Sequence, residues 1–286
     1  MNIVNSTKSF VIAFALIIIS FGATAQQQKP FFFIQMTDTQ FGFFTDNKDF
    51  KKETENFEKA ITAANRLRPA FVIVTGDLVN LPGDVAQINE YKRIVKLLDP
   101  SIPIYHLAGN HDVNNDPKTA DIKAHRKEFG RDYYTIKHNG MHGIVLNSLY
   151  FKSPGFVEQE AKAQDKWLLK ELKKAKRNGA NPLLVFQHHG WFLTDPAEKD
   201  AYFNIPLDTR TKYLNLFNEQ GVSHVFAGHY HRNAFGKSGP MEMVTTGPVG
   251  KPLGQDPSGI RIVIVKDGKV THQYYSLDAI PEEIAL

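Results

Sequence analysis

Short apolar runs alternate with longer amphipathic stretches through most of this chain. The apolar runs lie at residues 31–36, 71–77, 102–112, 143–148, 182–189 and 224–231. Runs of this length that end at polar or turn residues are typical of buried strands. Amphipathic stretches predict helices at residues 53–67, 85–98, 163–177 and 209–219. In the first of these, Phe57, Ile61, Ala64 and Leu67 fall on one helical face.

The last part of the chain has a different pattern. Residues 242–246, 259–265 and 270–276 have the composition of strands, and Asp267-Gly268 is typical of a hairpin turn. The earlier part therefore predicts strand–helix–strand units, and the last part predicts an antiparallel addition. For the fold class we expect α/β, with two packed mixed β-sheets flanked by helices in one domain at residues 26–286.

The first 25 residues have the order of a secretory signal peptide. Lys8 is the only charged residue before an apolar run at residues 10–21, and Ala23-Thr24-Ala25 offers a small-residue cleavage site. The alternative is a membrane anchor, but the run is shorter than the roughly 20 residues that a spanning helix needs. We expect cleavage after Ala25, no stable membrane anchor afterwards, and a periplasmic or secreted protein.

Composition limits the possible partners. The sequence contains no cysteine, which excludes disulfides and a lipid anchor attached through cysteine. Residues 26–286 carry 33 basic and 30 acidic side chains, a net charge of +3. This bias is too weak to indicate a nucleic-acid partner. The sequence leaves the oligomeric state open.

Five of the six apolar runs end on residues that commonly ligate metal ions. These residues are Asp38, Asp77, Asn110, His111, Asp112, His188, His189, His229 and His231. Because ligands bind at the carboxyl ends of strands in open α/β sheets, we expect these side chains to converge on one edge. Histidine nitrogen combined with carboxylate oxygen suits Zn, Fe or Mn better than Ca. The candidates exceed the needs of one ion, so the pattern indicates two divalent metal ions, a type of centre that performs phosphoryl transfer.

The order of these motifs resembles that of the calcineurin-like metallophosphoesterases. The family pattern is Asp-x-His, Gly-Asp, Gly-Asn-His-Asp, a single histidine and Gly-His-x-His. The chain shows it as Asp38-Thr39-Gln40, Gly76-Asp77, Gly109-Asn110-His111-Asp112, His188 and Gly228-His229-Tyr230-His231. The stretches TDTQFG, VFQH, GHYHRNA, GQDPSGIRIV and YYSLD are similar to a subgroup with animal serine/threonine phosphatase-like members. The resemblance runs from about residue 31 to residue 278 and implies the four-layer sandwich of that family.

The resemblance also implies roles for individual residues. It gives Asp38, Gln40, Asp77 and His231 to the first metal ion, and Asp77, Asn110, His188 and His229 to the second. Asp77 would bridge the two ions, and the alignment of VFQH favours His188, although the residues alone do not separate it from His189. His111 would protonate the leaving oxygen, with Asp112 orienting its ring.

Gln40 departs from the family pattern, which has histidine at this position. An amide oxygen is a harder and weaker donor than an imidazole nitrogen. Three readings follow. Gln40 ligates the first metal ion through its oxygen and favours Mn or Mg, or it holds a water molecule beside a weakly binding first site. In the third reading, the centre binds one metal ion and is poorly active. The first two readings are favoured, because Asp38, Asp77 and His231 are all present.

The expected function is hydrolysis of phosphomonoesters by water activated between two metal ions, with His111 as the general acid. One alternative is a phosphodiesterase acting on cyclic nucleotides, phospholipid headgroups or nucleotide sugars. Another is a weakly active metal-binding or interaction protein, which would need neither His111 nor Asp112.

Several other residues near the motifs receive no catalytic role. We expect surface or core positions for His106, His125, His138, His142, His224 and His272. The long loop that contains Trp191, Phe192 and residues 201–204 is either a functional lid or a packed aromatic cluster. Arg210, Arg232 and Asn233 have the chemistry to contact phosphate but stay outside the predicted catalytic set.

Overall fold

A computed structural model describes residues 29–286. The predicted signal peptide at residues 1–25 lies outside the described residues and stays a prediction. Within residues 29–286, no helix is long and apolar enough to cross a membrane.

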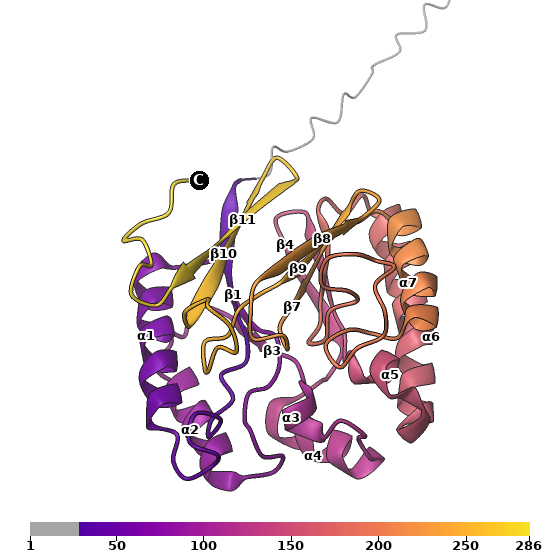
Figure 1. Cartoon of the computed structure of the whole chain (residues 1–286). Helices are drawn as coiled ribbons and strands as arrows, with labels where there is room; N and C mark the ends of the chain where they lie inside the picture. The colour runs from indigo at the N-terminus through magenta and orange to yellow at the C-terminus, as the bar shows by residue number, and fades with distance from the viewer. Residues whose placement is uncertain (1–28) are drawn as a thin grey trace, which may run out of the picture.

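The strands form two mixed β-sheets (Figure 1). The five-stranded sheet has the order β11-β10-β1-β2-β3, made of β1 (Phe31–Met36), β2 (Val72–Val74), β3 (Ile104–His106), β10 (Gly259–Lys266) and β11 (Lys269–Ser276). The six-stranded sheet has the order β4-β5-β6-β7-β9-β8, made of β4 (Tyr134–His138), β5 (Met141–Val145), β6 (Leu183–Phe186), β7 (Val222–Ala227), β8 (Ala234–Ser238) and β9 (Met241–Thr245). The predicted fold class is confirmed.

Each sheet combines a set of parallel strands with antiparallel strands, at one edge of the first sheet and at both edges of the second. β1 pairs in parallel with β2, and β2 with β3, whereas β10 and β11 add on antiparallel. In the second sheet β5, β6, β7 and β9 are parallel, and β4 and β8 are antiparallel edges. The carboxyl ends of the central strands in each sheet consequently lie at one end of that sheet.

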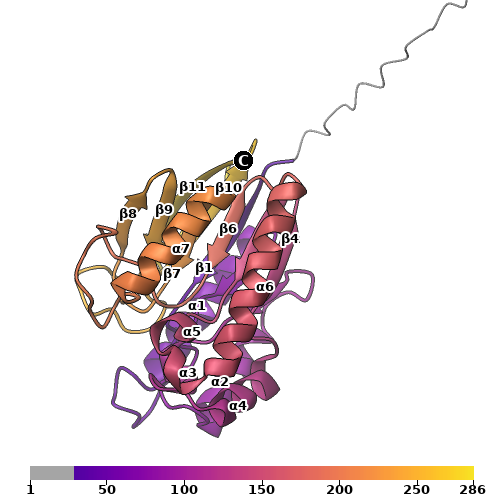
Figure 2. The same ribbon diagram turned by 90° about the vertical axis from the view of Figure 1, so that its right-hand side faces the viewer.

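Helices cover the outer faces of both sheets, so the domain has four layers (Figures 1 and 2). The helices are α1 (Lys51–Leu67), α2 (Val85–Val95), α3 (Asn110–Val113), α4 (Thr119–Phe129), α5 (Leu149–Lys152), a 3₁₀ turn at Pro154–Phe156, α6 (Glu158–Arg177) and α7 (Leu207–Gln220). Helices α1 and α2 lie beside the first sheet, and α6 and α7 lie beside the second. The four long predicted helices are thus confirmed, with ends that differ by a few residues.

An apolar core fills the space between the two sheets. Phe33 of β1 packs edge-to-face against Phe186 of β6 and Phe226 of β7, with ring centroids 5.6 and 5.9 Å apart. Such aromatic pairs add about 0.5–1.5 kcal/mol to the stabilisation from burial alone. This core holds β1 against β6 and β7, and so fixes the distance between the strand ends that carry the candidate ligands.

Three predicted details differ from the structure. The run at residues 102–112 is a strand only over Ile104–His106, and Asn110–Val113 form a helical turn. The edge strands β4 and β8 have no counterpart in the prediction, because each has only one fully buried residue, Ile136 and Ala234 respectively. Helix α4 also has no counterpart, since its buried residues within the element are only Ile122 and His125.

Candidate metal centre

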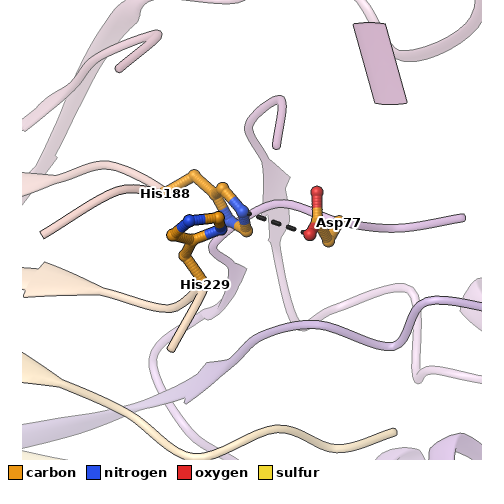
Figure 3. A group of neighbouring side chains, drawn as sticks. All are labelled: Asp77, His188 and His229. Atoms are coloured by element: carbon orange, nitrogen blue, oxygen red, sulfur yellow. Dashed lines mark ion pairs between the residues drawn. The ribbon is translucent and has the colours of Figure 1, made fainter. Parts of the chain in front are cut away.

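The candidate ligands meet at the carboxyl ends of strands from both sheets. Asp77, His188 and His229 each place one ligand atom within 4.8 Å of the others, as Figure 3 shows for their side chains. Asp38, Asp77 and His231 form a second group of the same size, so Asp77 belongs to both. The structure therefore brings together the carboxylates and imidazoles that the sequence predicts for two adjacent ions, with Asp77 between them.

The backbone at these positions adopts an uncommon conformation. Asp38, Gln40, Asp77, His229 and His231 all have positive φ angles, of 49°, 40°, 49°, 68° and 55°. A residue with a Cβ atom is disfavoured in this region by about 1–2 kcal/mol. Several such residues in one place are typical of a functional site, where the surrounding structure maintains the strain.

Two glycines in the motifs leave space for the ligand carboxylates. A Cβ atom on Gly109 would overlap the Oδ1 and backbone nitrogen atoms of Asp77. A Cβ atom on Gly228 would lie 2.5 Å from Asp38 Oδ2 and would also overlap Thr37. The glycines of the Gly-Asn-His-Asp and Gly-His-x-His motifs are therefore needed for close approach of one loop to another.

Hydrogen bonds to backbone carbonyls fix the orientation of three histidine rings. His188 Nδ1 lies 2.8 Å from Thr75 O, His229 Nε2 lies 3.3 Å from Tyr202 O, and His231 Nδ1 lies 2.6 Å from Lys251 O. A carbonyl can only accept, so these ring nitrogens carry the proton. The other nitrogen of each ring keeps a lone pair, as in metal-binding histidines with a supporting acceptor.

The free ring nitrogens of His188 and His231 point at carboxylate oxygens. His188 Nε2 lies 3.2 Å from Asp77 Oδ2, and His231 Nε2 lies 3.2 Å from Asp38 Oδ1. Two acceptors at this distance repel each other unless a cation or a proton lies between them. Both pairs are buried away from water, so the need for a cation or a proton between the two acceptors is greater.

The pKa values of Asp77, His188 and His229 show where the centre favours a positive charge. Burial lowers the pKa of His188, but the charge of Asp77 outweighs it and raises the pKa to about 9. Burial alone would raise the pKa of Asp77, yet the neighbouring histidines, His188 first, hold it below its usual range. His229 has no such close carboxylate partner, and burial followed by the charge of His188 lowers its pKa to about 3. The centre therefore attracts positive charge most strongly around Asp77.

Gln40 contributes an amide oxygen without a protein partner. The Gln40 side chain is 1% exposed, and its Nε2 atom donates to Asn80 Oδ1 at 3.0 Å. This bond fixes the amide so that Oε1 has no hydrogen-bond partner among residues 29–286. The Gln40 backbone N–H donates to Asp77 O at 2.9 Å, which places the residue beside the bridging aspartate. A buried unpaired acceptor is costly, and a cation beside it would satisfy it.

The contacts of Asp112 differ from the predicted ones. Its carboxylate accepts hydrogen bonds from the backbone N–H groups of Gly109, Leu78 and Val79, at 2.8–3.3 Å. The acceptor for the His111 ring is instead Asn80 O, 2.9 Å from Nδ1. Asp112 therefore holds two ligand loops together, and the Asn80 carbonyl orients the His111 ring. Burial and then the charge of Asp77 raise the pKa of Asp112 to about 7.

The two neighbouring histidines of the VFQHH run have separate surroundings. His188 lies with Asp77, and its Nε2 atom is 3.1 Å from Asn110 Oδ1. His189 Nδ1 lies 2.9 Å from Ser148 Oγ, and burial lowers the pKa of this ring well below its usual range. The structure thus places His188, and not His189, in the candidate ligand group.

A third group of potential ligands, His224, Glu242 and His272, lies away from this centre. Arg261 is a donor at 3.0 Å from His272 Nδ1, so the other ring nitrogen carries the proton and donates to Glu242 at 3.0 Å. His272 therefore has no lone pair to offer, and Arg261, His272 and Glu242 form a chain of hydrogen bonds.

A buried polar network behind the ligands was not predicted from the sequence. Arg261, 1% exposed, donates from Nε to Thr246 Oγ1 at 2.7 Å, and Thr246 donates to Gln35 Oε1 at 2.8 Å. Gln35 donates to Thr75 Oγ1 and to Ala227 O at 3.0 and 3.1 Å. Because Thr75 O supports the His188 ring, the network links the interface between the sheets to the ligands. The sequence signal for this network was Arg261, which stands between Ile260 and Ile262 in an apolar run.

The remaining candidates for phosphate contact have other partners. Arg210 is fully buried and donates to the backbone carbonyls of Pro196, Glu198 and Ile205. Asn233 accepts hydrogen bonds from Arg261 and from a backbone N–H. The Arg232 guanidinium donates to Leu253 O at 3.0 Å and to the Tyr230 hydroxyl at 3.2 Å, and it lies 4.9 Å from the Tyr230 ring.

Comparison with known proteins adds independent information. The sequence model of the family described as calcineurin-like phosphoesterase matches residues 33–233. The chain is 36% identical over 275 residues to human serine/threonine-protein phosphatase CPPED1, covering 91% of this chain and 88% of the relative. It is 35% identical over 280 residues to the Danio rerio protein of that name, covering 91% of each.

Similar solved structures agree on the fold. A purple acid phosphatase from yellow lupin superposes with a TM-score of 0.67 at 13% identity, covering 88% of this chain and 52% of that one. GAP50, the anchor in the inner membrane complex of Plasmodium, gives 0.62 at 13% identity, covering 87% and 85%. The family match over most of the domain, together with the phosphatase relatives, shows that this chain belongs to the calcineurin-like phosphoesterases, metal-dependent hydrolases of phosphate esters.

Proposed function

We propose that the protein hydrolyses phosphomonoesters at a centre of two divalent metal ions. The first ion would be held by Asp38, Gln40, Asp77 and His231. The second would be held by Asp77, Asn110, His188 and His229. The observation that carries this proposal is that Asp77 lies in both ligand groups, with buried lone pairs facing buried carboxylates.

The donor set fits hard or borderline divalent ions. The first group offers oxygen from two carboxylates and an amide with one ring nitrogen, which suits Mn. The second group includes two histidines, which also suits Zn or Fe. Bound there, a pair of dications would neutralise charge on the phosphate and lower the pKa of a water molecule.

In this proposal His111 donates the proton that the leaving group needs. Its backbone N–H donates to Asp77 Oδ1 at 2.8 Å, which anchors the residue beside both ligand groups. Its Nδ1–H group remains bonded to Asn80 O, so Nε2 is the ring atom that would give the proton to the leaving group. As the P–O bond breaks, this proton passes to the ester oxygen and an alcohol leaves, while water oxygen becomes part of the phosphate.

Positive charge near His231 supports a monoester rather than a diester substrate. Lys251 Nζ lies 5.1 Å from the centroid of the Phe43 ring, and that ring lies 5.3 Å from the ring of His231. The Lys251 carbonyl contacts the His231 ring, whereas the Arg232 guanidinium is bonded to Leu253 O and to the Tyr230 hydroxyl. A monoester carries one more negative charge than a diester, so the Lys251 cation beside the centre favours it.

Hydrolysis of two model esters tests the proposal. The protein would be stripped of metal, resupplied with Mn²⁺, and assayed with p-nitrophenyl phosphate and bis-p-nitrophenyl phosphate in parallel. Asp77→Asn should lower turnover by more than about a hundredfold, because even an outer partner of a metal ligand is worth about 10–100-fold. Asp132→Asn is the matched control, since Asp132 is an equally buried aspartate that pairs with Arg126 instead.

The outcomes separate the possible functions. Faster hydrolysis of the monoester, lost in Asp77→Asn and kept in Asp132→Asn, supports the proposal. Faster hydrolysis of the diester would make the protein a phosphodiesterase. Full activity of Asp77→Asn, or a metal content of one ion per chain in the active protein, would contradict the two-metal centre.

A further inference from the structure

The loop between β6 and α7 is held rigidly beside the metal centre. Arg210 binds three of its backbone carbonyls, those of Pro196, Glu198 and Ile205, with four hydrogen bonds of 2.7–3.1 Å. Lys152 donates to the carbonyls of Ala201 and Asn204 at 2.7 and 2.6 Å. Opening the loop would leave a buried guanidinium without partners, which is strongly unfavourable. Of the two predicted roles, a moving lid is therefore the less compatible with the structure.

The aromatic residues of this loop divide into two groups. Trp191 and Phe192 are fully buried in the core beneath the second sheet. Tyr202 is half-exposed, and its ring centroid lies 4.8 Å from that of His229. The first pair thus belongs to the packed cluster, whereas Tyr202 belongs to the surroundings of the metal centre.

Tyr202 contacts two candidate ligands of the second ion. Its backbone carbonyl lies 3.3 Å from His229 Nε2, which leaves His229 Nδ1 free for a metal ion. Its phenolic oxygen accepts a hydrogen bond from Asn110 Nδ2 at 3.2 Å, which turns Asn110 Oδ1 toward His188. One residue of a rigid loop therefore sets the orientation of two ligand side chains.

The phenolic proton of Tyr202 is available for a further partner. A tyrosine hydroxyl has one proton to donate and lone pairs to accept with. Asn110 Nδ2 donates to this oxygen at 3.2 Å. No protein acceptor for the Tyr202 proton lies within hydrogen-bonding distance in residues 29–286. Asn110 also places its Oδ1 atom 3.1 Å from His188 Nε2, so the hydroxyl lies beside the second ligand group.

We propose that Tyr202 binds the substrate, donating its phenolic proton to a phosphate oxygen at the metal centre. This inference rests on the proposed function and adds a residue that none of the sequence motifs contains. The ligand chemistry is that of a tetrahedral oxyanion, either the phosphoryl group of the substrate or the inorganic phosphate product. A neutral donor on a rigid loop binds such an oxygen without a large cost of reorganisation.

Tyr230 provides a matched comparison within the same rim. Its ring lies 5.0 Å from that of Phe203, but its hydroxyl accepts from Arg232 at 3.2 Å rather than from a candidate ligand. Tyr230→Phe therefore removes a rim hydroxyl that contacts no residue of the metal centre. Tyr202→Phe removes only the hydroxyl as well, and leaves the backbone carbonyl on His229 and the ring in place.

The test is the binding of inorganic phosphate to the Mn²⁺-loaded full chain by calorimetry. Wild type, Tyr202→Phe and Tyr230→Phe would be compared at saturating Mn²⁺, with the metal content of each sample measured. Phosphate affinity should fall by about tenfold to a hundredfold in Tyr202→Phe, the usual effect of losing one hydrogen bond to a charged group. It should stay unchanged in Tyr230→Phe.

The outcomes distinguish this inference from the proposed function. Equal phosphate affinity of Tyr202→Phe and wild type, at equal metal content, would overturn the role of Tyr202. An equal loss in both variants would also overturn it, since the effect would then belong to the rim in general. A wild-type protein that binds phosphate through Tyr202 but hydrolyses neither ester would refute the proposed hydrolysis and leave the oxyanion site standing.

Discussion

Replacing Gln40 by methionine tests whether its amide oxygen is a metal ligand. Methionine keeps the length and the unbranched shape of the side chain but offers no strong donor or acceptor. In the structure, the Oε1 atom is buried without a partner, and the Nε2 atom is bonded to Asn80. The substitution therefore removes one unfavourable group and one favourable bond together.

The two effects nearly cancel in the protein without metal. Removing a buried unpaired oxygen gains about 1–3 kcal/mol, and losing the bond to Asn80 costs about 0.5–1.5 kcal/mol. The free energy of unfolding in the presence of a chelator should therefore change little or rise slightly. Metal affinity should behave differently, because a bound cation satisfies Oε1 only in the wild type. Affinity for Mn²⁺ at the first site should fall by about 1–3 kcal/mol, or roughly 5–150-fold.

Calorimetric titration with Mn²⁺ and urea denaturation with chelator measure these two quantities. Gln187→Met is the control, because Gln187 is also fully buried and its Oε1 atom also lacks a partner in the described residues. Its Nε2 atom donates to His189 O, in the same way as Gln40 donates to Asn80. Unchanged Mn²⁺ affinity in Gln40→Met, or the same loss in both variants, would refute ligation by Gln40.

Two further predictions concern stability. Arg261→Met should lower the free energy of unfolding, measured by urea denaturation, by about 3–5 kcal/mol, because Thr246, Asn233 and His272 lose a buried partner. A loss below about 1 kcal/mol would contradict a stabilising role of this network. Burial lowers the pKa of His125 to about 4 from an ordinary 6.5, so the unfolded chain binds a proton at a higher pH than the folded chain. The free energy of unfolding should therefore fall as the pH is lowered from 6.5 to 4, by up to about 3 kcal/mol. His125→Leu should weaken that decline, and an unaltered pH dependence would count against it.

The sequence by itself determined the central strands, the four long helices and the set of candidate ligands. Its apolar runs predicted the central strands because these are buried on both faces, and nearly every residue in β1, β5 and β6 must be apolar. The convergence of the candidate ligands could be predicted because a metal needs particular residue types, and strand ends bring distant residues to one edge. The edge strands β4 and β8 were missed because half-exposed strands carry a weaker pattern.

Only the tertiary structure decided which partner each polar group has. His188 and His189 are adjacent in a strand end and point to different sides, so their roles depend on what lies on each side, Asp77 or Ser148. Gln40 Oε1 lacks a partner because Asn80 fixes the orientation of the amide, and the Tyr202 hydroxyl keeps its proton free because Asn110 donates to its oxygen. Both partners are far away in the sequence. Hydrogen bonds between distant residues follow from how the two sheets pack, and no local pattern in the chain encodes that packing.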